Sequence, residues 1–254
     1  MTEADLRCGE LALIGRITSA SNATFLGSIG DTTVIYKPAA GERPLWDFPD
    51  GDLARREVAA YLVSESFGWN VVPRTWLRDG PLGLGMVQLW QDPDPEQDAV
   101  DLVSADAVPD GWRHVFAGTD ELGRPVALTH EDSPALRRMA VFDVVVNNAD
   151  RKGAHILPMA GGHRHGVDHG LTFHLEHKLR TVLWGWLGDS LNAAELDGID
   201  RLRTDLAGGL GDILSGLIRD TEIDALDARC EQFRAEGRFP APHGEMPAMP
   251  WPLF

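Results

Sequence analysis

Residues 144–157 read VVVNNADRKGAHIL, and within them an apolar run changes into a polar segment. Asp150 ends the Asn-Asn-Ala-Asp sequence after the valines, and His155 follows five positions later, before a new apolar pair. Further along, the segment Gly166-Val167-Asp168-His169-Gly170 places a second Asp between an apolar residue and a His-Gly pair. Each Asp alone says little, and the order and spacing of the two segments make them informative.

This order of groups is typical of phosphoryl transfer. In such sites one carboxylate orients the attacking hydroxyl, and a second carboxylate holds the metal ion on the nucleotide phosphates. The sequence between the two Asp residues predicts a short hairpin, with strands at 156–158 and 165–167 and Gly161-Gly162 at the tip. The hairpin would lie between the two Asp-bearing loops.

The composition is that of a globular chain. The 254 residues are 43% hydrophobic and 24% charged, which suits one large domain or two small lobes with a sizeable core. The formal net charge is −16, from 39 acidic and 23 basic residues. Such a surface repels nucleic acid and anionic membranes, so we expect no nucleic-acid partner and disfavour an enzyme that stays on a lipid surface. A nucleotide would need local positive groups and a metal ion to hold it.

The cysteines and the N-terminal residues indicate a reduced, cytoplasmic protein. Cys8 and Cys230 are far apart and neither belongs to a CxxC motif, so neither a zinc finger nor a disulfide framework is expected. The first five residues are acidic and lack an apolar segment, and no apolar run reaches membrane-spanning length. Stable membrane insertion is therefore not expected.

The first 90 residues predict a small lobe of mainly antiparallel strands with one helix. Gly30-Asp31 is a two-residue hairpin signal. Pro38 ends the strand that follows this hairpin, because proline cannot donate to a strand ladder. The expected strands are at 10–18, 24–29, 32–38, 71–77 and 85–90.

The helix of this lobe is expected over 53–67. Asp52 is a suitable N-cap, and Gly68 suits the end of the helix. Arg55 and Arg56 are expected to point away from the buried face.

Two charged residues of the first lobe have alternative interpretations. Lys37 is either a surface residue on an edge strand or a phosphate-binding group that points into a cleft. Glu57 is either a partly exposed carboxylate or the partner of a cation, since it borders the apolar stripe of the helix. An unpaired buried charge is costly, so a buried Glu57 would need such a partner.

The second lobe, 91–254, is expected to be mainly helical. Residues 91–109 are acidic and proline-bearing, which favours a connector, and 112–128 contain short extended pieces. Ser133 and Pro134 predict the start of a helix that ends near Asn147. Further helices are expected at 193–206, 211–217 and 222–233. The tail, 240–254, should wrap the surface with Trp251 and Phe254 tucked in.

The predicted α+β organisation resembles the two-lobed protein-kinase-like fold, with a small antiparallel-sheet lobe, one helix and a mainly helical lobe. Within that fold, the arrangement of lobes and motifs is similar to that of phosphoinositide 3- and 4-kinase-related proteins. This branch has bacterial members and HipA-type relatives. Those proteins have Asp-Arg-His, an Asn five residues after the Asp, and an Asp-Phe-Gly-type metal motif. Here the residues are Asp150-Arg151-Lys152-Gly153-Ala154-His155 and Asp168-His169-Gly170. The resemblance covers residues 11–187.

The resemblance implies a role for each charged residue of the pattern. Lys37 would bind the α- and β-phosphates of ATP and pair with Glu57. Asp168 would bind Mg²⁺ or Mn²⁺, and Asp150 would orient the acceptor hydroxyl and take its proton. Arg151 would either screen the developing charge or pair with a neighbouring carboxylate.

It also implies where the nucleotide is held. The turn that contains Ser21, Asn22 and Thr24 would cover the phosphates through backbone N–H and hydroxyl groups. The hinge beneath the adenine would run from Met86 to Trp90 and include Val87, Gln88 and Leu89, with backbone groups making the hydrogen bonds to the base.

Three residues or segments depart from the family pattern. His155 stands where an Asn metal ligand is expected, and imidazole favours Mn²⁺ or Zn²⁺ over Mg²⁺. Lys152 replaces the usual His, and the phosphate-covering turn has only Gly15 and Gly27 at its flanks. Because of these departures, three alternatives stay open: a kinase with weak activity, a kinase with a different metal preference, and a pseudokinase that only binds the nucleotide.

The leading hypothesis is an ATP-dependent phosphotransferase that moves the γ-phosphoryl group to a hydroxyl of a protein Ser or Thr, of the chain itself, or of a small molecule or lipid. A pseudokinase regulator and an AMP-transferase are the alternatives. A metal-dependent phosphoesterase is a further one, because six histidines crowd one region, although no HExxH motif is present. These are His155, His163, His165, His169, His174 and His177.

Overall fold

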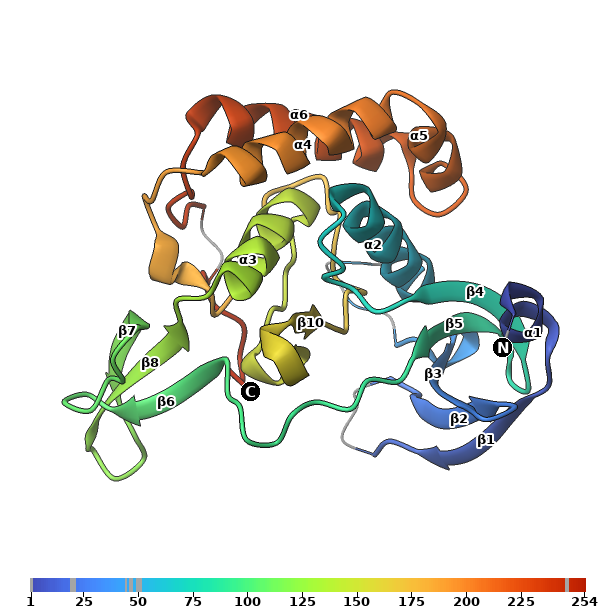
Figure 1. Ribbon diagram of the computed structural model, residues 1–254, viewed down its shortest axis with the longest axis horizontal. Coiled ribbons are helices and arrows are strands. Elements are labelled where there is room, and N and C mark those ends of the chain that lie inside the picture. Colours follow the sequence, from blue (N-terminus) through green and yellow to red (C-terminus); the bar gives the residue numbers. More distant parts are fainter. Residues whose placement is uncertain (1, 19–21, 44, 46–47, 49–51, 245–246) are drawn as a thin grey trace.

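The computed structural model describes residues 2–18, 22–43, 45, 48, 52–244 and 247–254 (Figure 1). The expected α+β class is confirmed, since the chain combines antiparallel sheets with several helices. In Figure 1 a five-stranded sheet and a three-stranded sheet lie at opposite ends, with helices α2 and α3 between them. Helices α4 and α6 cross the top of this view.

The five-stranded sheet is antiparallel and has the order β1-β2-β3-β5-β4. The first three strands agree closely with the predicted positions, and Gly30 makes the tight turn at a φ of 55°. The fourth strand begins at Thr75, later than predicted, because Pro73 lacks the N–H that a ladder needs. The strands are β1 (Leu11–Arg16), β2 (Phe25–Ile29), β3 (Thr32–Pro38), β4 (Thr75–Gly80) and β5 (Gly83–Leu89).

A short helix, α1 (Glu3–Cys8), precedes this sheet and was not predicted. Its signal was present in the sequence, because Thr2 and Asp5 form a capping box with reciprocal side-chain to backbone bonds.

Helix α2 (Leu53–Phe67) has the predicted bounds, but its N-cap prediction is wrong. Asp52 lies in the left-handed region at a φ of 61° and makes no side-chain cap bond. The Glu42 carboxylate replaces it and accepts from the backbone N–H of Leu53 at 3.1 Å and of Ala54 at 2.8 Å. A carboxylate from outside the helix thus satisfies the first free N–H groups and complements the helix dipole.

Helix α2 is buried on several sides, so the expectation that Arg56 points away from the core is wrong. The guanidinium of Arg56 is buried, donates to Glu222 Oε1 at 2.6 Å and also donates to the Thr172 carbonyl. Side chains of α2 join the main apolar core with Phe142 of α3 and Leu202 of α4. The helix therefore connects the five-stranded sheet to the helical part.

The three-stranded sheet was only partly anticipated. Residues 100–104 belong to it as β6, so the interpretation of 91–109 as a pure connector is wrong. β6 is short and largely exposed, and its pairing with a strand more than twenty residues later leaves little local pattern. The sheet has the order β6-β8-β7, with β6 (Val100–Ser104), β7 (Trp112–Thr119) and β8 (Pro125–Glu131).

The remaining elements follow the prediction closely. Ser133 caps its helix by accepting from the Leu136 N–H at 3.2 Å, and the expected hairpin is formed by β9 and β10. The elements are α3 (Pro134–Val146), β9 (Ile156–Pro158), β10 (Arg164–Gly166), α4 (Ala193–Leu206), α5 (Gly209–Leu214) and α6 (Asp220–Glu236). Single 3-10 turns occur at η1 (Ala39–Gly41), η2 (Gly153–His155), η3 (Ala160–Gly162) and η4 (Trp184–Trp186).

The C-terminal segment follows the surface, but its aromatic side chains are not tucked in as predicted. Trp251 is 85% exposed and Phe254 is 47% exposed. Backbone bonds hold the segment instead, because Ala248 and Leu253 carbonyls accept from Thr181 and Gly153 N–H groups. Among the described helices, none has the length and apolar character needed to cross a membrane.

The buried pair of Arg56 and Glu222 provides a test of the packing between α2 and α6. Arg56→Met should lower the free energy of unfolding by about 3–5 kcal/mol, because it leaves the Glu222 carboxylate buried without its cation. Urea denaturation measures the change. Arg124→Met is the control, since it removes an exposed partner of Asp120 and should leave stability unchanged. Equal losses in the two variants would contradict the assignment.

Candidate active site

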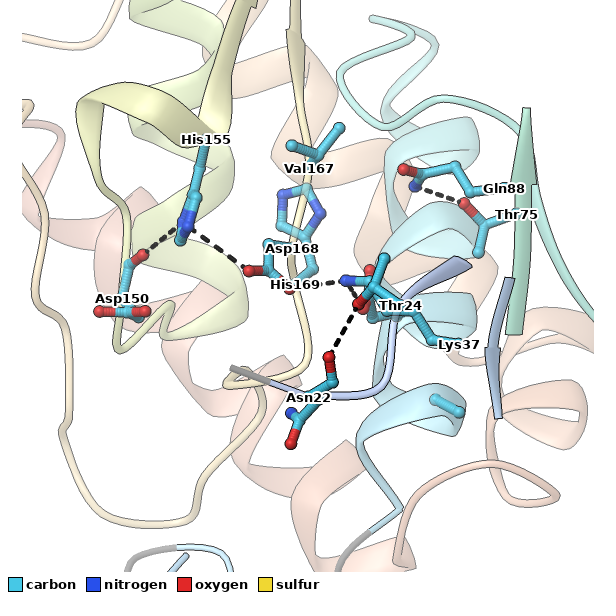
Figure 2. Close-up of polar contacts among 12 residues, drawn as sticks. Asn22, Thr24, Lys37, Thr75, Gln88, Asp150, His155, Val167, Asp168 and His169 are labelled. Atoms are coloured by element: carbon cyan, nitrogen blue, oxygen red, sulfur yellow. Dashed lines mark hydrogen bonds and ion pairs between the residues drawn. The ribbon is translucent and has the colours of Figure 1, made fainter. Parts of the chain in front are cut away.

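A cavity of about 720 Å³ lies between the five-stranded sheet and the loops that follow α3. Its walls come from β3, β5, α2, the Asp150 loop and the segment around Asp168. Figure 2 shows that Lys37, Asp168, His155 and Asp150 follow one another across this region. The two Asp-bearing segments and the charged residues of the first lobe are therefore brought together.

Lys37 lies in the cavity wall and is not a freely solvated surface lysine. Its ammonium donates to Glu57 Oε1 and to Asp168 Oδ1, each at 2.6 Å. Burial by itself lowers the pKa of Lys37, but the carboxylates of Asp168 and Glu57 overcome this effect and raise the pKa above its ordinary value. Lys37 is thus a fixed cation that joins a strand, a helix and a loop.

The two carboxylates beside Lys37 are in different surroundings. Glu57 is buried, and burial raises its pKa although the Lys37 ammonium opposes the effect. Asp168 has about half of its side chain exposed, and the Lys37 ammonium lowers its pKa well below the usual range. Asp168 also has a φ of 64°, in the left-handed region that Asp tolerates better than most residues. Its carboxylate is therefore ionised and accessible from the cavity.

His155 lies between the two Asp residues. Its Nδ1 is 2.9 Å from the Asp150 carbonyl oxygen, and its Nε2 is 3.4 Å from Asp168 Oδ2. Burial lowers the pKa of His155, in spite of the attraction of Asp168. In Figure 2 the imidazole connects the Asp150 loop to the Asp168 segment.

Asp150 is fixed by its own loop. Its backbone N–H donates to Asn148 Oδ1 at 3.0 Å, and its carboxylate lies 3.1 Å from the Lys152 ammonium. Burial raises the pKa of the Asp150 carboxyl, and the Lys152 ammonium works against this rise. A carboxylate with a raised pKa is a better proton acceptor than a fully solvated one.

Arg151 does not reach the cavity. Its guanidinium is fully buried and forms two bonds of 2.8 Å to the carboxylate of Asp143, which is also fully buried. Of the two roles left open by the sequence, pairing with a carboxylate is the one that this geometry provides. Sequence reasoning missed Asp143, although a lone acidic residue inside the apolar run AVFDVVV was a signal for a buried pair.

The residues expected around the nucleotide are only partly in place. Asn22, Thr24, Gln88 and Leu89 line the cavity, and the Thr24 hydroxyl donates to the Asn22 carbonyl at 3.3 Å. Figure 2 shows Asn22 and Thr24 on the side of the cavity near Lys37. Ser21 lies outside the described residues.

The side chains of Met86 and Val87 do not line the cavity, and the hinge stays a prediction about their backbone groups. Met86 packs against Ala54 and Val58 of α2, whereas Val87 belongs to the apolar cluster on the other face of the sheet. Both residues pair with β3 and β4 in the middle of the sheet. A central strand gives its side chains to the two packed faces, and only its end reaches the cavity.

Several cavity residues carried no sequence signal of their role. Arg43 and Arg180 add positive charge to the wall, and Leu157 and Leu171 add apolar surface. They come from segments that are far apart in the chain, so only the folded arrangement brings them together.

The crowded histidines do not form one cluster. His169 is fully buried, accepts from Arg151 Nη2 at 2.6 Å, and has a pKa well below the ordinary value because of burial. His163 contacts His165, and His177 stacks on His243. Within the described part of the chain, no three His, Cys, Asp or Glu side chains gather as metal ligands. A metal ion here would complete its coordination with phosphate or water oxygens.

No protein-family model matches the chain. Protein Rv2133c of Mycobacterium tuberculosis is 50% identical to this chain in an alignment of 259 residues. The alignment covers 97% of this chain and 93% of the relative. The chain belongs to the family of Protein Rv2133c. The crystal structure of the Helicobacter pylori proinflammatory kinase CtkA has a TM-score of 0.48 and 11% identity to this member of the family. That similarity covers 91% of this chain and 94% of CtkA.

Gly153 provides a test of how the C-terminal segment supports the Asp150 loop. A side chain at Gly153 would collide with the Phe254 ring, and the Gly153 N–H donates to the Leu253 carbonyl at 2.8 Å. Gly153→Ala should lower the free energy of unfolding by about 1 kcal/mol, the low end for overpacking, because the Phe254 ring is partly exposed and can shift. In a Phe254→Ala background the same change should cost much less, because the ring is gone. Urea denaturation of the four proteins measures the coupling, and equal costs in both backgrounds would refute the contact.

Proposed function

We propose that this protein is an ATP-dependent phosphotransferase of the protein-kinase-like type, with residues 1–90 and 91–254 as its two lobes. The single observation that carries the proposal is the position of Lys37, bonded to both Glu57 and Asp168 in a cavity that also holds Asp150. The sequence likeness of the two Asp-bearing segments to phosphoinositide-kinase-related proteins supports that branch as the finer assignment.

The cavity suits a nucleotide in size and in the distribution of its groups. A volume of about 720 Å³ is within the range of small-molecule and cofactor sites. Ile35, Leu89 and Leu171 offer apolar surface for the base. The Lys37 ammonium lines the cavity and would bind the phosphates, and Thr24, the residue before β2, lines it as well.

Asp168 and His155 would hold the divalent metal ion. The donor set fits, because the ionised Asp168 carboxylate faces the cavity and His155 Nε2 lies beside its Oδ2. When bound, the ion supplies charge neutralisation on the phosphate oxygens. Lys37 fixes the other oxygen of Asp168 and holds the carboxylate toward the site.

Asp150 would orient the acceptor hydroxyl and take its proton. Its carboxylate is at the cavity wall and has a raised pKa, and both features suit a general base. Arg151 would act as a positioning residue, because it joins Asp143 to the carbonyl oxygens of His155 and Val167. The acceptor is proposed to be a protein Ser or Thr or a small-molecule hydroxyl. The net charge of −16 disfavours an anionic lipid surface.

Phosphotransfer is tested with ATP labelled at the γ- or the α-phosphate. We expect ADP release and incorporation of the γ-label into the chain or an added hydroxyl acceptor. Asp150→Asn and Asp168→Asn should each lower the rate by about 100-fold or more, since each removes a group that acts on the reacting atoms. Asp110→Asn is the matched control, because Asp110 is exposed and lies outside the cavity.

Three outcomes would contradict the proposal. Unchanged rates in the two site variants would place the activity elsewhere. Incorporation of only the α-label would indicate AMP transfer. Nucleotide binding without ADP release or label transfer would indicate a pseudokinase regulator.

A further inference from the structure

We propose that the metal ion of this site is bound through the imidazole nitrogen of His155 and that the site consequently selects a first-row transition ion, with Mn²⁺ as its representative, over Mg²⁺. The inference rests on the proposed function only in that nucleotide phosphates complete the coordination. The donor atoms thereby specify the class of metal ion, which the fold does not determine.

The first observation is the tautomer of His155. Its Nδ1 lies 2.9 Å from the carbonyl oxygen of Asp150, and a carbonyl oxygen can only accept a hydrogen bond. Nδ1 therefore carries the proton, and in the neutral ring Nε2 carries a lone pair. This is the arrangement of metal-binding histidines, in which one ring nitrogen donates to an oxygen and the other is left for the ion.

The second observation is what that lone pair faces. Nε2 lies 3.4 Å from Asp168 Oδ2, so two electron-pair donors point into one small space. A cation between them would use both lone pairs. Two ligand atoms that are each about 2.1 Å from one ion lie between about 3.0 Å apart at a right angle and about 3.4 Å apart at a tetrahedral angle. The observed separation fits a shared ion.

The third observation is that both ligands are held in place by other contacts. Lys37 occupies Oδ1 of Asp168 and leaves Oδ2 toward the imidazole. The Val167 N–H donates to the His155 carbonyl at 3.0 Å, and that carbonyl also accepts from Arg151 Nη1 at 3.2 Å. These bonds tie the segments that carry the two ligands, so the donor pair is preorganised before an ion arrives.

Metal selectivity follows from the nature of the donors. Mg²⁺ demands near-ideal octahedral oxygen coordination, whereas imidazole suits Zn²⁺, Cu²⁺, iron and Ni²⁺. Mn²⁺ also takes oxygen ligands, but it belongs, at the weak end, to the transition-ion series whose affinity extends to nitrogen donors. A site with one imidazole, one carboxylate and phosphate oxygens should therefore hold Mn²⁺ more tightly than Mg²⁺. An amide oxygen in place of the imidazole would remove this preference.

The test uses Mn²⁺ binding to the full chain with a non-hydrolysable ATP analogue, followed by electron paramagnetic resonance. Bound Mn²⁺ should show coupling to a directly bound ¹⁴N nucleus, and competition with Mg²⁺ gives the affinity ratio. His155→Asn should abolish the coupling and lower the Mn²⁺ to Mg²⁺ ratio by about tenfold or more, because loss of even an outer-shell partner weakens metal binding 10- to 100-fold. His114→Asn is the matched control, since His114 is exposed on β7 and away from the cavity.

The result separates the metal assignment from the phosphotransferase assignment. Nitrogen coupling in the parent protein and in His114→Asn, but not in His155→Asn, supports the proposal even if no phosphoryl transfer is detected. Absent coupling in the parent protein, or an unchanged Mn²⁺ to Mg²⁺ ratio in His155→Asn, overturns it even if Asp168-dependent transfer is found. Circular dichroism of each variant verifies that the fold is retained. If His155→Asn is misfolded, the parent protein is prepared with ¹⁵N-labelled histidine. Replacement of the ¹⁴N coupling by a ¹⁵N coupling shows that a histidine nitrogen binds the Mn²⁺ ion, and an unchanged ¹⁴N coupling contradicts the proposal.

Discussion

The buried ion pair of Arg151 and Asp143 is the interaction on which the site depends. Two fully buried charges carry a large desolvation penalty, which is offset only when geometry is good and every donor is used. Arg151 forms two bonds to Asp143 and further bonds to His169 and to the carbonyl oxygens of His155 and Val167. One guanidinium therefore fixes the end of α3, the Asp150 loop and the segment before Asp168.

This pair also explains features around it that are otherwise unrelated. Gly166 has no side chain because a Cβ there would press against the guanidinium of Arg151. His169 stays neutral, since it is buried and accepts a hydrogen bond from Arg151. Asn148 reinforces the loop by donating to Asp143 Oδ1 at 2.9 Å. Hydrogen bonds centred on Arg151 thus hold the segments that carry Asp150 and Asp168, and among the described residues His169 Nδ1 is left buried without a partner.

The cavity wall combines cations with carboxylates in a chain whose net charge is −16. Lys37, Arg43 and Arg180 line it together with Glu42, Glu57, Asp150 and Asp168, and Lys152 lies beside Asp150. A polyphosphate ligand would therefore depend on these individual cations, because the wall as a whole is not positively charged. The arrangement favours binding through fixed contacts over general attraction to polyanions.

The sequence predicted the local elements well, because their signals lie within a few residues. The strands around Gly30, the bounds of α2 and α4, and the hairpin between the two Asp residues all follow from turn residues, caps and apolar spacing. It failed where distant partners decide the outcome. β6 pairs with β8, although β7 lies between them in the chain, and the cap of α2 comes from Glu42 in place of Asp52.

The same division applies to the candidate site. The sequence by itself determined the fold class and the order of the Asp150 loop and the Asp168 segment. It also indicated Lys37 and Glu57 as a candidate ion pair. Only the tertiary structure decided that Lys37 bonds to both carboxylates and that Arg151 is buried with Asp143, outside the cavity lining. The physical reason is that spacing along a chain reports which residues share an element. Burial and long-range ion pairs depend on which elements meet, and that is set by the packing of the whole core.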